Sequence, residues 1–172
     1  MGEQGVGSLL KGVSGVRWGE LRDATGGGAG GIPSLLSRIA FGDADTGRGA
    51  VDDLGDAVCA MGFVVGEATP LVVPFLLELA VSPQVACKAE LLDLLGNIYR
   101  AEQWHAAAAA AGSRPGDARY REQAGWEAAA RAAVAAGRSG VEGVAGSVRP
   151  EEALPARGLL RVMADTPPFP EL

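Results

Sequence analysis

The segments Ile32-Pro33-Ser34-Leu35-Leu36 and Val73-Pro74-Phe75-Leu76-Leu77 decide the fold, because the second repeats the first 41 positions along the chain. In the same register Leu54 corresponds to Leu95. Each copy therefore predicts a short helix that starts near a proline, followed by a longer helix with matching core positions. A single helical hairpin cannot bury both of its apolar faces, whereas stacked hairpins share one continuous core.

Helical spacing of apolar residues continues outward from these two segments in both directions. It predicts helices at 18–21, 33–40, 45–61, 71–81, from an N-cap at Ser82 into the alanines at 106–111, and at 118–136, 141–148 and 151–164. Strand signals are nearly absent. A period near 41 residues is typical of HEAT and armadillo repeats. We therefore expect an all-α fold, a right-handed α-α superhelix of seven or eight helices, forming a single domain over residues 1–165.

The remaining residues, 166–172, form a tail with three prolines that cannot hold a helix. Two alternatives stay open for this tail, an extended free end or a segment that docks on a partner or on its own domain. The longest apolar stretch, Ala68–Val81, contains prolines and a glutamate and is shorter than the roughly 20 residues of a membrane-spanning helix. We expect a cytoplasmic protein with no membrane association.

Composition argues against several classes of function. The chain has 15 basic and 21 acidic side chains, a net charge of −6, which disfavours nucleic-acid binding. The single histidine, His105, forms one Glu-x-x-His pair with Glu102, whereas di-iron bundles use two. The glycine run at 26–31 follows a helical signal rather than the strand that a dinucleotide site needs. We predict a non-enzyme with no catalytic, cofactor-binding or metal-binding residues.

The expected helix over 45–61 carries three aspartates, Asp52, Asp53 and Asp56, opposite its apolar stripe. The stripe consists of Val51, Leu54, Val58 and Met61. Residues 1–99 hold 6 basic and 12 acidic groups, whereas residues 100–172 hold 9 of each, so the charge imbalance lies in the first half. The aspartates form either a solvated outer face or a patch that steers a basic partner.

Aromatic residues gather in the second half of the chain, at Trp104, Tyr120 and Trp126. Core packing is one interpretation of this group. The other is a groove for a partner, because Trp and Tyr are enriched at binding hot spots. Trp104 and Trp126 therefore join the three aspartates as candidate partner-binding residues.

Several motifs resemble HEAT-repeat proteins of the actinobacterial type, over roughly residues 18–164. The motifs are Trp18-Gly19-Glu20-Leu21, the two Pro-led segments, Glu67–Leu76, Leu91–Ile98 and Trp126–Gly137. The resemblance implies a curved helical scaffold that binds proteins, and some relatives are suspected of acting beside toxin systems. It predicts a non-catalytic scaffold, in its most specific form an immunity-like or regulatory protein that engages a basic toxin or effector. The alternatives are a HEAT-like enzyme such as a DNA glycosylase, or a structural subunit of a larger complex.

Overall fold

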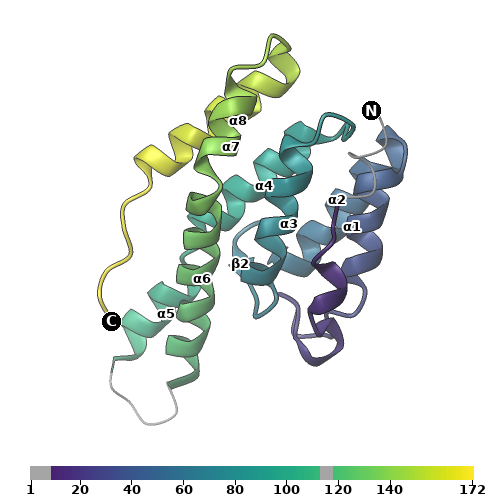
Figure 1. Cartoon of the computed structure of the whole chain (residues 1–172). Coiled ribbons are helices and arrows are strands. Elements are labelled where there is room, and N and C mark those ends of the chain that lie inside the picture. Colours follow the sequence, from purple (N-terminus) through teal and green to yellow (C-terminus); the bar gives the residue numbers. More distant parts are fainter. Residues whose placement is uncertain (1–8, 113–117) are drawn as a thin grey trace.

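The computed structural model describes residues 9–112 and 118–172, and these are mostly helical (Figure 1), which confirms the all-α prediction at this level. The helices are α1 (Ile32–Phe41), α2 (Ala44–Val58), α3 (Thr69–Val81), α4 (Lys88–Arg100), α5 (Gln103–Ala111), α6 (Ala118–Ala136), α7 (Arg138–Ala145) and α8 (Pro150–Asp165). Strand β1 (Cys59–Ala60) pairs antiparallel with β2 (Val64–Val65). The first predicted helix is a 3-10 turn, Trp18–Glu20, after a similar turn at Val13–Gly15.

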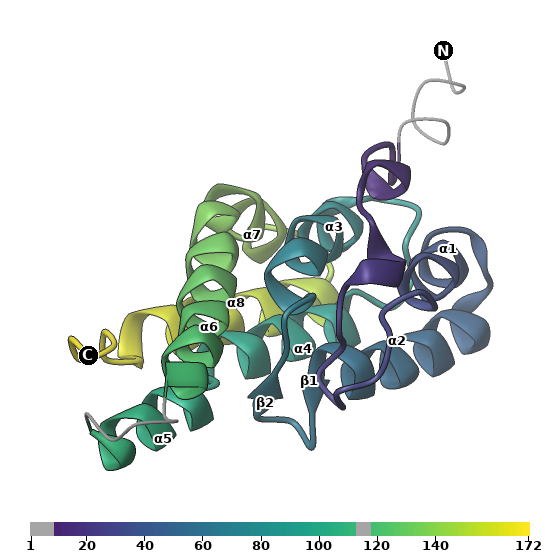
Figure 2. The ribbon, with the colours of Figure 1, turned by 90° about the horizontal axis from the view of Figure 1, so that it is seen from below.

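The helices form two layers. Helices α1 and α2 pack together, as do α3 and α4, and α7 packs on α8. Helix α3 lies between α1 and α6 in one layer, and α4 lies between α2 and α8 in the other (Figure 2). Helix α5 is an addition to this arrangement that packs on α6. Among the residues that the structure describes, none of the helices combines the length and the hydrophobicity that spanning a membrane requires.

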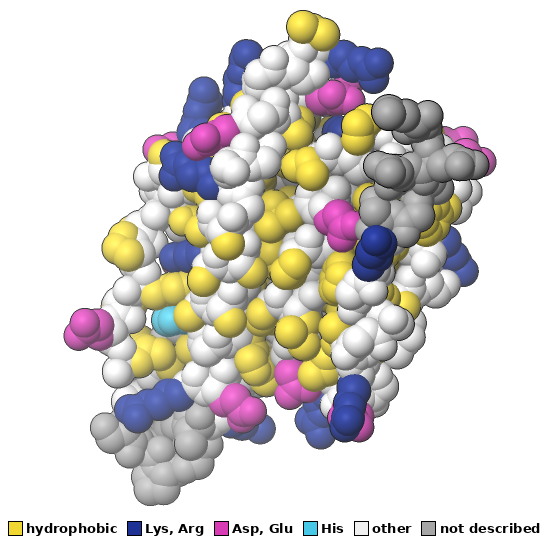
Figure 3. Space-filling view, viewed as in Figure 1, with side chains coloured by type: hydrophobic (Ala, Val, Ile, Leu, Met, Phe, Trp, Pro, Cys, Tyr) yellow, Lys and Arg dark blue, Asp and Glu magenta, His cyan; other side chains and the backbone are white. Residues whose placement is uncertain are grey.

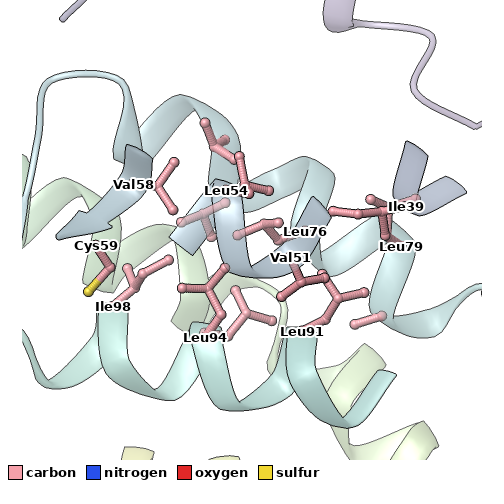
Figure 4. Close-up of a cluster of buried hydrophobic side chains, with 14 of the residues drawn as sticks. Ile39, Val51, Leu54, Val58, Cys59, Leu76, Leu79, Leu91, Leu94 and Ile98 are labelled. Carbon is pink, nitrogen blue, oxygen red and sulfur yellow. The ribbon is translucent and has the colours of Figure 1, made fainter. Parts of the chain in front are cut away.

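The 41-residue register places equivalent residues in equivalent core positions. Val51 and Leu54 of α2 are buried, and so are their counterparts Leu92 and Leu95 of α4. In Figure 4, side chains from α2 and α4 face Leu76 of α3 in one hydrophobic cluster. The core positions predicted from the repeat are therefore confirmed for α2 and α4. In the two Pro-led segments the match is partial, because Leu35 and Leu77 are half-buried whereas their counterparts Leu76 and Leu36 are buried.

Local sequence signals fix where the paired helices begin. The Asp43 side chain accepts a hydrogen bond from Thr46 N at 2.8 Å and caps α2, and this backbone bond lowers the pKa of Asp43. Pro33 of α1 and Pro70 of α3 lie in the first turn, where no backbone N–H is required. The prediction that Pro74, the counterpart of Pro33, begins a helix is wrong, because α3 starts at Thr69 and Pro74 lies inside it. Gly42 lies between α1 and α2. A Cβ at this position would overlap the Arg38 carbonyl, so a larger residue could not be accommodated without a shift of the backbone.

The predicted third helix is wrong at its C-terminal end. Helix α2 stops at Val58 and the chain enters the β1–β2 hairpin. Met61 and Gly62 both have positive φ, at 55° and 84°, and Phe63 N donates to the Ala60 carbonyl at 3.1 Å. This turn cannot continue a right-handed helix. Met61 was expected on the apolar stripe but is 77% exposed at the hairpin tip.

The predicted fifth helix is two helices. Pro83 does not begin a helix; α4 starts only at Lys88. The chain then leaves helical geometry at Ala101 and Glu102, and α5 begins at Gln103. This break lets α5 turn away from α4 and pack on α6.

The last part of the fold joins α6 to α7 at Gly137. A Cβ on Gly137 would overlap the Leu77 side chain, so this glycine allows the chain to pass close to α3.

Hydrophobic side chains gather across the middle of the face formed by α3 and α6 (Figure 3). Helix α8 ends at Asp165, and residues 166–172 contain no helix.

Candidate protein-binding site

The three candidate aspartates lie where the helical spacing predicts. Asp52, Asp53 and Asp56 are all exposed on α2, whereas Val51, Leu54 and Val58 of the same helix are buried. The early end of α2 does not alter this arrangement, because all three aspartates precede its last residue. None of these carboxylates forms an ion pair with a basic side chain of residues 9–112 or 118–172.

Two of the aspartates line a groove of about 290 Å³ between α2 and α4. Asp52 and Asp56 contribute from α2, and Glu90 and Asp93 contribute from α4. Asp53 does not line this groove. We call these four carboxylates the acidic groove. It contains no lysine or arginine among its described lining residues, so its local charge is strongly negative.

Sequence reasoning missed the half of the acidic groove that α4 provides, although the repeat contained the signal. Asp93 lies 41 positions after Asp52, and Asn97, which also lines the groove, lies 41 positions after Asp56. Equivalent positions of stacked hairpins point in similar directions, so acidic residues in one register converge on one surface. Applying the register to polar as well as apolar positions predicts this convergence.

The electrostatics of the groove favour a cation. Burial raises the pKa of Asp93, the neighbouring Glu90 carboxylate raises it further, and Arg100 opposes both effects. When the pKa of a carboxyl group is raised in this way, a positive group placed beside it stabilises the charged carboxylate. One turn before Asp52, Arg48 bridges Asp45 at 3.3 Å and Glu90 at 3.2 Å. These exposed bridges neutralise only one edge of the groove.

Apolar side chains border the acidic groove at the β1–β2 hairpin. Gly62 lines the groove, and its neighbours Met61 and Phe63 are 77% and 47% exposed. Exposed apolar groups beside charged ones are typical of protein-binding surfaces, where a desolvated contact adds affinity to electrostatic steering. The hairpin tip and the groove therefore form one continuous candidate surface.

The two candidate tryptophans lie outside the acidic groove. Trp104 and Trp126 are both half-buried and pack against the core. The indole Nε1 of Trp104 donates to the Val65 carbonyl at 2.8 Å, and its ring stacks on Tyr120 at 6.4 Å. These contacts favour the core-packing interpretation, because they tie α5 to β2 and α6. The structure does not bring either tryptophan together with the aspartates.

A second cavity, of about 440 Å³, has balanced charges. Its basic residues Arg48, Lys88 and Arg149 are matched by three glutamates. Burial lowers the pKa of Lys88, whose Nζ donates to the Val85 carbonyl at 2.6 Å and lies 3.8 Å from Glu152. Because these charges offset one another within the cavity, it has less preference for a charged partner than the acidic groove has.

The single histidine takes part in a different buried polar cluster. His105 is 7% exposed and its Nδ1 lies 2.7 Å from Glu127 Oε1, not beside Glu102. Glu127 also accepts hydrogen bonds from Trp104 N at 2.9 Å and from His105 N at 2.8 Å. The carboxylate of α6 therefore caps the first turn of α5. In the described ranges, no three His, Cys, Asp or Glu residues group as metal ligands.

Both cysteines are buried, and we expect neither to be reactive. Burial raises the pKa of the Cys59 thiol to about 11 and also raises that of Cys87. The thiolate is the reactive form. At about pH 8 the native chain should therefore react with Ellman's reagent far more slowly than the same chain in urea, where both thiols should react. Fast reaction of the native chain would contradict this, and the variants Cys59→Ala and Cys87→Ala would identify the reactive thiol.

Comparison with protein-family models, curated proteins and solved structures finds no match to this chain. The resemblance to HEAT-repeat proteins is therefore an expectation that these comparisons leave untested.

Proposed function

We propose that the chain is a non-catalytic, cytoplasmic protein-binding scaffold whose hairpins stack as a right-handed HEAT-like superhelix. In the most specific form of this proposal, it is an immunity-like or regulatory protein that engages a basic effector. The acidic groove is the observation that carries the proposal. It places four carboxylates from two helices around one concave surface, beside the exposed Met61 and Phe63.

The charge of this surface also bears on the alternative of a DNA glycosylase. Such an enzyme needs a basic surface for the phosphate backbone, whereas this groove would repel phosphate. A structural subunit of a larger complex is compatible with the same groove. Affinity purification with the wild-type chain, followed by mass spectrometry, would identify the partner and distinguish a single basic effector from a stable assembly.

Neutralising the acidic groove is expected to slow association with a basic partner. The variant Asp52→Asn/Asp56→Asn/Asp93→Asn should lower the association rate constant at least about tenfold at low salt, because it removes charge that steers the encounter. The difference should shrink at about 0.5 M salt, where the Debye length is only a few ångströms. Stopped-flow or surface-plasmon measurements with the purified partner would provide both values.

The matched control changes the same charge elsewhere. Asp53, Glu20 and Glu122 are all exposed and lie outside the groove. The triple variant Asp53→Asn/Glu20→Gln/Glu122→Gln should therefore affect the association rate much less than the groove variant. If both triple variants lower the association rate constant equally, the steering depends on net charge and not on the acidic groove. If neither variant changes the association rate constant, the acidic groove is removed from the proposal.

A further inference from the structure

The C-terminal tail, residues 166–172, is seated on the helical domain. Figure 1 shows it running from the end of α8 towards α5. Its Phe169 ring lies 3.6 Å from the His105 ring, centre to centre, with 1° between the two planes. The guanidinium carbon of Arg131 lies 3.4 Å from the same phenyl centre. We call the surface formed by His105 and Arg131 the tail socket.

The distances show that Phe169 is sandwiched. A group within 3.6 Å of a phenyl centre must lie over a ring face, because an approach in the ring plane would overlap the ring atoms. The imidazole and the guanidinium cannot occupy the same face at these distances without overlapping each other. They therefore lie on opposite faces of Phe169, an arrangement that combines aromatic stacking with a cation–π contact.

The walls of the tail socket are held by the helical domain. Glu127 orients His105 through the bond at 2.7 Å. Arg131 Nε donates to the Tyr99 carbonyl at 2.9 Å, and Arg131 Nη1 donates to the Pro167 carbonyl of the tail at 3.0 Å. Arg131 is only 9% exposed, and its Nη2 is a buried donor without a partner in the described chain. The tail socket thus presents two fixed planar groups, the His105 imidazole and the Arg131 guanidinium, together with the unpaired donor Arg131 Nη2.

The tail itself has few other attachments. After Thr166, none of its backbone N–H groups donates a hydrogen bond to the described chain. Pro168, Pro170 and Glu171 are exposed, and Leu172 is 54% exposed. The segment is therefore held mainly by the Phe169 ring and the Pro167 carbonyl. Proline-rich extended segments bind aromatic-lined surfaces in this way, because they lose little conformational entropy on binding.

We infer that the tail socket is a peptide-binding site for an extended partner segment that carries a phenylalanine between prolines, and that the chain's own tail occupies it as an intramolecular competitor. The site is separate from the acidic groove and does not depend on a basic partner. The seated tail shows which chemistry the socket accepts, and the small number of tail contacts makes exchange with a segment in trans feasible.

The experiment compares the full-length wild type with Phe169→Ala, using the acetylated peptide of residues 165–172 as the probe. Emptying the socket removes the intramolecular competitor, whose effective concentration on a short linker is in the millimolar range. We expect the variant to bind the peptide at least about tenfold more tightly than the wild type. The same peptide with alanine in place of phenylalanine should not bind.

The single histidine provides an independent readout. Stacking under Phe169 shifts the His105 imidazole proton resonances through the ring current, so Phe169→Ala should move them and the probe peptide should restore them. Phe41→Ala, at a 55% exposed phenylalanine on α1, should leave them unchanged. A folded Phe169→Ala variant that binds no peptide would overturn the inference. His105 resonances that do not shift in Phe169→Ala would also overturn it. A wild-type dimer that requires Phe169 would overturn it as well, because a second copy of the chain would then occupy the tail socket.

Discussion

Replacing Glu127 with alanine is expected to lower the free energy of unfolding by about 3–5 kcal/mol, the range measured when one partner of a buried charged network is removed. Glu127 is fully buried, accepts hydrogen bonds from two backbone amides and faces the His105 imidazole. Alanine leaves these groups without an acceptor in a site that water cannot readily reach. Urea denaturation followed by circular dichroism would measure the change.

The matched control for this prediction lies on the same helix. Glu122 is exposed on α6, and Glu122→Ala should change the free energy of unfolding by no more than about 0.5 kcal/mol. Glu127→Gln should cost less than Glu127→Ala, because the amide oxygen still accepts hydrogen bonds. If Glu127→Ala is as mild as Glu122→Ala, the carboxylate does not cap α5 as described.

Leu54→Ala and Leu95→Ala are each expected to cost about 2–5 kcal/mol of unfolding free energy, as buried large-to-small changes do. Both side chains are fully buried, at equivalent positions of the first two hairpins. Denaturant melts of the two variants would test the repeat directly, since equivalent core positions predict losses of similar size.

Leu154→Ala on α8 is the control for the leucine variants, because Leu154 is 61% exposed. It removes the same atoms but should change the free energy of unfolding by no more than about 0.5 kcal/mol. Near-neutral results at both Leu54 and Leu95 would show that the 41-residue register does not identify the core.

The parts of the fold predicted from sequence are those with a local periodic signal. Apolar spacing in α2 identified the buried Val51 and Leu54, and it also placed Asp52 and Asp53 on the opposite, exposed face. The repeat then extended the core assignment to α4. These features depend on residues three or four positions apart on one helix, and the sequence displays that relation directly.

The features that were missed depend on residues far apart in the chain or on short turns. The alanines of α5 continue a helical pattern, so nothing local indicated the break at Ala101 and Glu102. The carboxylate that caps α5, Glu127, is 22 residues beyond His105. The hairpin at Met61 requires positive φ at a residue other than glycine, which no propensity predicts. The docked position of Phe169 depends on two helices at once.

The capping of α5 by Glu127 has a consequence for the order in which the chain folds. A nine-residue helix is too short to be stable alone in water, even when rich in alanine. Its first turn is completed by a carboxylate that leaves the ribosome only after another 22 residues have been synthesised. Helix α5 is therefore a late element of the folding pathway, whereas the α1–α2 hairpin contains its own cap at Asp43 and can form early.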